Sequence, residues 1–87
     1  MDRSQVFSAI KANIVEIIDN AKGVDIQETQ SMRDLGADSL EIIEVVSRSM
    51  KQLKIKVPRT ELADLNNIGD LVSIFEKYAQ QEVGNAT

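Results

Sequence analysis

The spacing of apolar residues over the first twenty positions is typical of an amphipathic helix. Apolar side chains recur there at steps of three and four residues, which places them on one helical face. These residues are Val6, Phe7, Ile10, Ile14, Ile17 and Ile18. Ser4 is the expected N-cap, because its hydroxyl can accept from the free N–H groups of the first turn. We predict a helix from about Ser4 to Asn20, ended by Gly23.

A second helix is predicted to begin sharply after residue 37. Asp38 followed by Glu41 has the spacing of a capping box, with Asp in place of the more usual Ser or Thr. The apolar positions that follow are Leu40, Ile42, Ile43, Val45, Val46, Met50 and Leu53. This stripe is wider than one buried face requires, so some of Leu40, Ile42 and Ile43 should remain exposed.

The remaining segments predict a long connection, a short helix and a final helix. The connection spans about 21–37, and its expected anchors to the core are Val24, Ile26, Met32 and Leu35. The Val57-Pro58 step should end the second helix, since a residue before proline avoids the α region. One or two helical turns should follow over 60–65. Asn66 or Asn67 then caps the last helix. Its expected buried face consists of Ile68, Leu71, Val72, Phe75 and Tyr78.

Together these elements predict an all-α fold, a four-helix bundle with three longer helices and one short helix. The 87 residues allow a single domain, with a core over about 4–80 and a frayed polar tail over 81–87. Hydrophobic residues make up 43% of the chain and aromatic residues only 3%. The core must therefore consist mainly of Ile, Leu, Val and Met.

Charge and missing residue types restrict the function. The formal net charge of −4 argues against nucleic acid as a partner, because phosphate binding needs a cationic face. No apolar run approaches the roughly 20 residues that span a bilayer, and the N-terminus lacks the pattern of a secretory signal. We therefore expect a cytoplasmic monomer that does not enter membranes. The sequence contains no Cys and no His, which removes the thiol nucleophile, the Ser–His pair and the usual zinc ligands. Composition thus favours a protein that is not an enzyme and holds no metal.

The most informative string is Leu35-Gly36-Ala37-Asp38-Ser39-Leu40. Ser39 falls at the first position of the predicted second helix, on the surface and beside free N–H groups. A hydroxyl at this place suits the attachment of a phosphodiester, because the positive end of the helix dipole favours an anion. Nothing nearby in the sequence would activate it as a hydrolytic nucleophile. Ser39 is thus an attachment point or simply a residue in the first turn of a helix.

In this string the sequence resembles the acyl carrier protein family, whose modified serine lies in a Gly-x-Asp-Ser-Leu motif at the start of the second helix. The resemblance covers about residues 4–80 and includes the long first connection and the Val57-Pro58 step. It implies that a phosphopantetheinyl transferase, using coenzyme A and Mg²⁺, attaches 4′-phosphopantetheine to Ser39. The thiol of this arm would carry acyl groups as thioesters, and the chemistry would belong to the partner enzymes.

The resemblance also implies contacts around the serine. Asp38, Glu41 and Glu44 would meet basic residues of the transferase, although both glutamates also fit a solvated helix face. Leu40 and Ile43 would form an apolar patch against partner enzymes, or else pack in the core. The buried side chains of the helices would accept part of an acyl chain only if a cavity exists, and core packing is the preferred interpretation. These side chains include Phe7, Ile14, Val46, Leu53, Leu71 and Phe75.

One region departs from the carriers of bacterial fatty acid synthesis, whose second and third helices are strongly acidic. Residues 45–60 contain no Asp or Glu but hold five of the chain's ten basic residues. They are Arg48, Lys51, Lys54, Lys56 and Arg59. This face is a solvated surface or a docking surface of reversed sign, and we name Arg48, Lys51 and Lys56 as candidate partner contacts.

The run from Ile55 to Ile68 resembles free-standing carriers of polyketide β-branching cassettes. Such a carrier presents acetyl to a hydroxymethylglutaryl synthase-like enzyme. The predicted function is therefore an acetyl-donor carrier of polyketide biosynthesis, with a ketosynthase or a hydroxymethylglutaryl synthase-like enzyme as partner. The alternatives are a carrier for fatty acid synthesis or for an aminoacyl group, and an unmodified helical interaction module.

Overall fold

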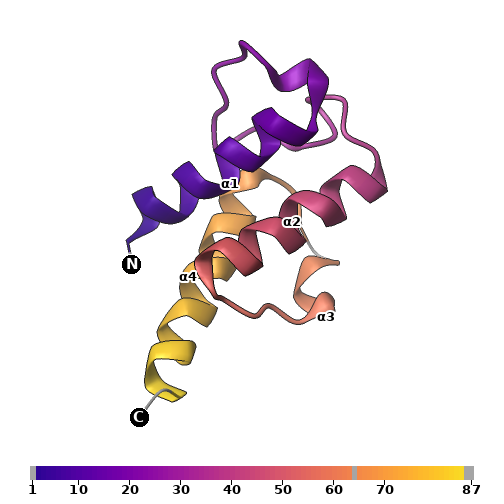
Figure 1. Cartoon of the computed structure of the whole chain (residues 1–87). Coiled ribbons are helices and arrows are strands. Elements are labelled where there is room, and N and C mark those ends of the chain that lie inside the picture. Colours follow the sequence, from indigo (N-terminus) through magenta and orange to yellow (C-terminus); the bar gives the residue numbers. More distant parts are fainter. Residues whose placement is uncertain (1, 64, 86–87) are drawn as a thin grey trace.

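The start of the first helix, α1, is set by a capping box. The computed structural model describes residues 2–63 and 65–85, with side chains up to residue 79. Helix α1 covers Arg3–Ile17 (Figure 1). Asp2 Oδ1 accepts from the Gln5 N–H at 2.9 Å, and Gln5 Oε1 accepts from the Asp2 N–H at 3.0 Å. The prediction that Ser4 caps this helix is wrong: the cap is Asp2, two residues earlier, which forms a reciprocal pair with Gln5.

The end of α1 also differs from the prediction. The helix stops at Ile17, and a 3₁₀ turn, η1, follows at Asp19–Ala21. Ile18 between them has extended backbone and a side chain that is buried in the core. Gly23, with φ of 80°, follows η1 and begins the long loop, so it does not end α1 itself.

Helix α2 covers Ser39–Leu53 and begins at Asp38, as predicted. The helix ends earlier than the Val57-Pro58 step, where its end was predicted. Lys54 adopts a left-handed conformation with φ of 58°, and its N–H donates to the Met50 carbonyl. This conformation costs a non-glycine residue about 1–2 kcal/mol, and it turns the chain away before the Val57-Pro58 step. That step therefore lies in the connection to α3 and is not the terminator of α2.

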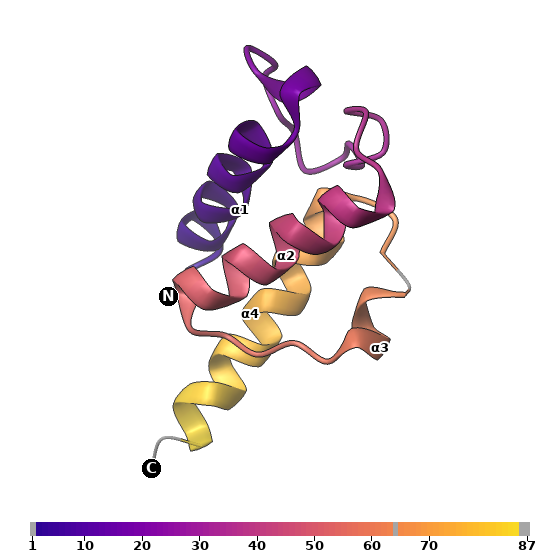
Figure 2. The ribbon, with the colours of Figure 1, turned by 45° about the vertical axis from the view of Figure 1, so that its right-hand side comes forward.

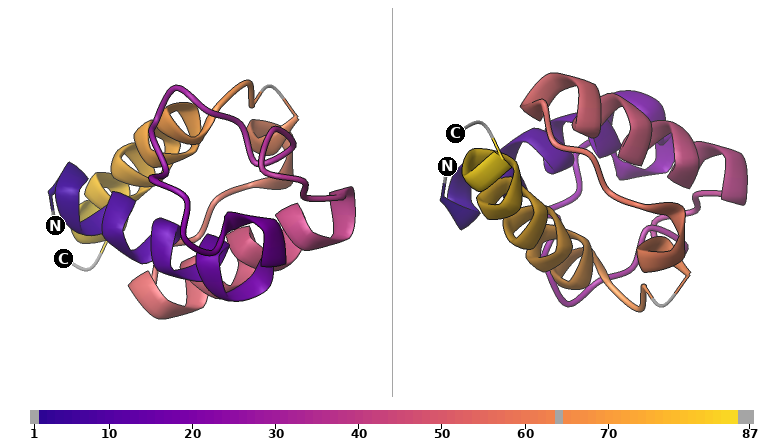
Figure 3. Two further views of the ribbon diagram at one scale, coloured as in Figure 1. Left: turned by 90° about the horizontal axis from the view of Figure 1, so that it is seen from above. Right: turned by 90° about the horizontal axis from the view of Figure 1, so that it is seen from below.

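The long loop between η1 and α2 passes over one end of the bundle (Figure 3). Ile26, Met32 and Leu35 are buried and anchor it to the core as predicted. Val24 is 37% exposed, so the prediction that it is a fourth anchor is wrong. Gly36 closes a tight turn before α2 with φ of 93°, a conformation that glycine adopts without strain.

Helix α3 covers Arg59–Leu62, a single turn, in agreement with the one or two helical turns predicted here. Helix α4 covers Ile68–Asn85. The Asp70 N–H donates to Asn67 Oδ1 at 2.8 Å, which identifies Asn67 as the cap at its start. The α4 backbone is helical through residue 85, which includes most of the tail predicted to be frayed; the last two residues of the tail lie outside the described residues.

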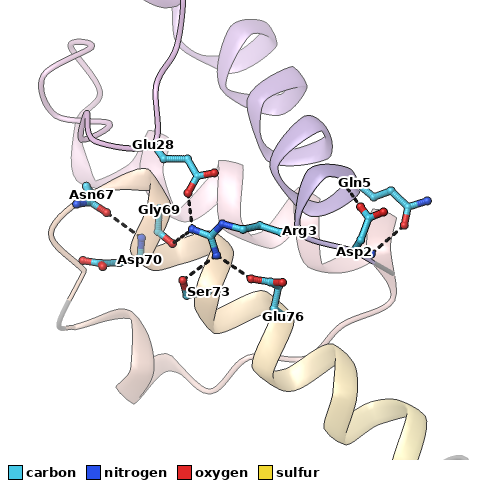
Figure 4. A network of polar contacts seen from close by, with 9 residues as sticks. All are labelled: Asp2, Arg3, Gln5, Glu28, Asn67, Gly69, Asp70, Ser73 and Glu76. Carbon is cyan, nitrogen blue, oxygen red and sulfur yellow. Dashed lines mark hydrogen bonds and ion pairs between the residues drawn. The ribbon is translucent and has the colours of Figure 1, made fainter.

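Arg3 fastens the long loop to the bundle (Figure 4). Its guanidinium donates to Glu28 in the loop, to the Gly69 carbonyl at 3.2 Å, to Ser73 Oγ at 2.9 Å and to Glu76 Oε1 at 2.7 Å. The loop also pairs directly with the start of α4, because the Gly69 N–H donates to the Glu28 carbonyl at 2.9 Å. These bonds hold the loop that leads to Ser39.

The core lies between α1, α2 and α4, and α1 contacts both of the others (Figure 2). Phe7, Leu53 and Tyr78 were predicted to be buried but are only partly buried at its edge. One buried polar contact joins α1 to α2: Asn13 Nδ2 donates to Ser49 Oγ at 2.9 Å. Ile14, Val46, Leu71 and Phe75 are buried as predicted. The predicted all-α bundle of three longer helices and one short helix is confirmed.

Candidate functional site

Ser39 is the first residue of α2, and its side chain is exposed. The preceding residue caps the helix: Asp38 Oδ1 accepts from the Glu41 N–H at 2.8 Å, and Glu41 Oε1 accepts from the Asp38 N–H at 3.0 Å. This reciprocal pair is the capping box that the sequence predicts. It holds Ser39 at a rigid helix start, where the hydroxyl is open to a large partner.

The immediate neighbour of the Ser39 hydroxyl is a cation. Arg33 Nη2 donates to Ser39 Oγ at 3.2 Å. A guanidinium has no lone pair to accept a proton, so it cannot act as a general base. The Asp38 carboxylate accepts from the Glu41 N–H. The described surroundings of Ser39 thus suit an attached anion better than an activated nucleophile.

Arg33 is not among the site residues predicted from the sequence. It lies six residues before Ser39, and the turn through Gly36 brings it back to the hydroxyl. The one signal in the sequence was its sign, because the other charges in this stretch, Asp34 and Asp38, are acidic. The sequence alone does not show that this cation lies beside Ser39, because its position depends on the turn between them.

Two large apolar side chains lie exposed beside the serine. Leu40 is 77% exposed and Ile43 is 52% exposed. Ile42, between them, packs against the core and is partly buried. The prediction that some of these three remain in solvent is confirmed. Exposed Leu and Ile side chains on one face next to Ser39 provide a surface that a partner can cover.

The acidic residues of α2 are partly engaged within the protein. Glu41 belongs to the capping box, and Glu44 Oε2 lies 3.5 Å from Arg48 Nη2. Arg48 also pairs with Glu16 of α1, with 3.3 Å between Nη1 and Oε1. Arg48 is therefore a weaker source of free positive charge than the sequence suggests.

Three lysines at the end of α2 and in the segment after it line an apolar hollow of about 620 Å³. We call it the lysine groove. Lys51, Lys54 and Lys56 are exposed at its rim. Met50, Ile55 and Val57 also line it and are buried or partly buried. The structure thus brings together two of the predicted basic contacts, Lys51 and Lys56, around one apolar surface.

A second apolar hollow, of about 300 Å³, lies between α2 and α3. Ile43, Val46 and Met50 line it from α2, and Leu62 lines it from α3. This hollow could not be predicted from the sequence, because its size depends on the distance between α2 and α3.

An ion pair ties the short helix α3 to α4. Lys77 Nζ lies 3.1 Å from Glu61 Oε2. Two hydrogen bonds lower the pKa of the Glu61 carboxyl below its ordinary value of 4.5. The bond from Lys77 has the larger effect and the bond from Tyr78 the smaller one. The charged form of Glu61 is therefore favoured when α3 is in place.

Other kinds of site have no support in the described part of the chain. Among the side chains that the structure describes, no three or more His, Cys, Asp or Glu residues form a group that could hold a metal ion. Within the described residues, no helix is both long and apolar enough to cross a lipid bilayer.

Comparisons with known proteins agree with this geometry. Residues 8–75 match the family model described as a phosphopantetheine attachment site. The chain is 31% identical over 80 residues to the polyketide biosynthesis acyl carrier protein AcpK of Bacillus subtilis, with 92% of this chain and 98% of AcpK covered. It is 32% identical over 75 residues to an acyl carrier protein of Thermotoga maritima, with 86% and 93% covered.

A solved structure also has the same fold. It is a complex of the curacin biosynthetic pathway HMG synthase with acetyl donor-ACP. The match has a TM-score of 0.78 and 35% sequence identity, and it covers 86% of this chain and 96% of the matched chain. The family model spans most of the sequence and includes the capped start of α2. The chain therefore belongs to the acyl carrier protein family, whose cofactor is covalently attached 4′-phosphopantetheine.

Proposed function

We propose that Ser39 carries the phosphopantetheine arm and that the chain delivers acetyl to a hydroxymethylglutaryl synthase-like enzyme in polyketide β-branching. The observation that carries the first part is the exposed hydroxyl at the capped start of α2. The string from Gly36 to Leu40 that contains it fits the Gly-x-Asp-Ser-Leu motif by which the sequence resembles the carrier family.

The residues around Ser39 fit the attached group. The hydroxyl is exposed, a guanidinium lies 3.2 Å from it, and the free N–H groups of the helix start are adjacent. In the transfer, Ser39 Oγ would form a bond to the phosphorus of coenzyme A that joins the pantetheine, and adenosine 3′,5′-bisphosphate would leave. The hydroxyl proton would pass to a base of the transferase. The arm supplies the thiol that the chain lacks, since the sequence has no Cys.

Two observations support the β-branching pathway. The matched complex contains an acetyl donor carrier bound to an HMG synthase, and AcpK is named a polyketide carrier. The lysine groove adds a physical reason, because Lys51, Lys54 and Lys56 give a positive surface to the end of α2 and the segment that follows it. A positive rim around an apolar floor complements an acidic, apolar surface on a partner.

A carrier for fatty acid synthesis is the second candidate within the family. The 32% identity to an acyl carrier protein of Thermotoga maritima is similar to the identity to AcpK, so identity does not separate the two roles. We also propose that the chain is not an enzyme by itself. Incubation of the purified carrier with acyl thioesters should give no turnover above the uncatalysed rate.

Mass spectrometry tests the attachment site. The chain is incubated with coenzyme A, Mg²⁺ and a broad-specificity transferase, and its intact mass is measured. Wild type and Ser47→Ala should each gain one phosphopantetheine, while Ser39→Ala should gain none. Ser47 is the matched control because it is an exposed serine on the same helix. Absence of any gain in wild type would favour an unmodified interaction module, and a gain in Ser39→Ala would place the arm elsewhere.

Binding to the synthase tests the docking surface. Charge reversal in Lys51→Glu/Lys56→Glu should raise the Kd for the synthase by about tenfold at low salt, mainly through a slower association rate. Neutral Lys51→Gln/Lys56→Gln should give a smaller rise. The control is Lys11→Glu/Lys22→Glu, which changes the net charge equally but lies outside the groove. Equal affinity of the reversed and control variants would leave the lysine groove as solvated surface.

A further inference from the structure

Arg33 is held close to Ser39 by the turn that precedes α2. The Gly36 N–H donates to the Arg33 carbonyl at 3.0 Å, and the Ala37 N–H donates to the Met32 carbonyl at 3.0 Å. These bonds fix the Arg33 backbone relative to the helix start. Its Nη2 then donates to Ser39 Oγ across six residues, at 3.2 Å.

The charge of Arg33 is available, whereas the acidic groups around it are engaged. Asp38 and Glu41 accept from each other's backbone N–H groups, and Asp34 Oδ2 accepts from the Ser31 N–H at 3.3 Å. Among the described residues, no carboxylate lies within ion-pair distance of the Arg33 guanidinium. Within that part of the chain, one of its five N–H donors is used, by Ser39 Oγ.

We propose that Arg33 is a positioning residue that binds the phosphodiester of the arm on Ser39. This inference rests on the proposed attachment at Ser39. The non-bridging phosphate oxygens would lie two bonds from Oγ, within reach of a guanidinium that already contacts Oγ. Arginine binds phosphate with two parallel N–H donors, and such charge-assisted bonds are stronger than neutral ones.

The contact has a chemical consequence for the arm. Asp34, Asp38 and Glu41 give the start of α2 a negative charge, which disfavours a second anion there. Arg33 offsets that repulsion and restricts the first bonds of the arm, so the arm leaves the helix in a preferred direction. Because the phosphate is covalently attached, its effective concentration at Arg33 is high although both groups are exposed.

The test compares unmodified and modified protein. Wild type, Arg33→Gln, Arg33→Lys and the control Arg59→Gln are each prepared in both forms, and intact mass verifies the modification. Arg59 is the control because it is also exposed but lies on α3. The readout is the change in Tm on modification, together with the ³¹P chemical shift of the phosphodiester.

The Tm change on modification should be more favourable in wild type than in Arg33→Gln by about 2–4 °C at low ionic strength. The difference should shrink strongly at about 1 M salt. Arg33→Lys should keep part of it, and Arg59→Gln should match wild type. The ³¹P shift should move only in the Arg33 variants.

An equal Tm change and an equal ³¹P shift in wild type and Arg33→Gln, with both proteins fully modified, would overturn the role of Arg33 and leave the attachment at Ser39 intact. Failure of wild type to gain the arm at all would overturn both the attachment and the role of Arg33.

Discussion

The guanidinium of Arg3 offers a quantitative test of how the loop before Ser39 is held. Arg3→Gln removes the cation and all four of its contacts, to Glu28, Gly69, Ser73 and Glu76 (Figure 4). Hydrogen bonds to Glu28, the larger cause, and to Glu76 raise the pKa of Arg3. The residue is therefore charged at every pH used in the assay.

The expected loss follows from the exposure of the partners. The Arg3, Glu28 and Glu76 side chains are 40%, 35% and 31% exposed. Ion pairs at such exposure contribute about 0.2–1 kcal/mol each, and the bonds to Gly69 and Ser73 add a similar amount. A cation in the first turn opposes the helix dipole, so its removal returns about 0.3 kcal/mol. We expect Arg3→Gln to lower the free energy of unfolding by about 1.5 kcal/mol, which for a domain of this size lowers Tm by about 6–12 °C.

Urea unfolding followed by far-UV circular dichroism measures this loss. Arg48→Gln is the matched control, because Arg48 also faces two carboxylates but at 3.3 and 3.5 Å, with partners 70% and 56% exposed. It should cost less than about 0.5 kcal/mol. A double-mutant cycle with Glu28→Gln should return a coupling of about 0.5–1 kcal/mol. Equal losses in Arg3→Gln and Arg48→Gln would refute the reasoning, since the contacts of Arg3 would then contribute no more than surface pairs.

Two further predictions concern the turn before α2 and the short helix α3. Gly36→Ala should lower the free energy of unfolding by about 2 kcal/mol, because its φ is 93° and a new Cβ would lie 2.7 Å from Asn20 Nδ2. Gly23→Ala, with φ of 80° and no atom within 4 Å, should cost about 1 kcal/mol in the same urea assay, and an equal cost would exclude crowding by Asn20. The lowered pKa of Glu61, caused mainly by Lys77, means that its stabilisation is present above pH 4.5 and is lost as the pH falls through the folded-state pKa. Wild type should therefore lose more stability than Glu61→Gln between about pH 5 and 3, and parallel pH profiles would contradict this.

Local signals predicted the part of the site that depends on neighbouring residues. Asp38 and Glu41 lie three residues apart, so their capping box is decided within one turn and places Ser39 at the helix start. For the first helix, the cap was predicted at the wrong residue. Ser4 fits a cap by type, but Asp2 has Gln5 at the spacing that completes the pair.

Helix ends were predicted less well, because the deciding conformations lie outside the apolar pattern. The left-handed backbone at Lys54 ends α2, although lysine carries no preference for that conformation. The prediction relied on Pro58, whose effect reaches only the preceding residue. The end of α1 was missed for a similar reason. The extended backbone at Ile18 goes with the burial of its side chain in the core, which the apolar pattern does not show.

The sequence by itself determined the fold class, the capped helix start and the position of Ser39, because these follow from spacings of three or four residues. Only the tertiary structure decided which apolar side chains of α2 stay exposed, since the broad stripe around Leu40 and Ile43 suits either a core or a surface. It also decided the polar contacts of Arg33 and Arg3. These depend on a turn and on segments up to 73 residues apart, which come together only when the bundle packs.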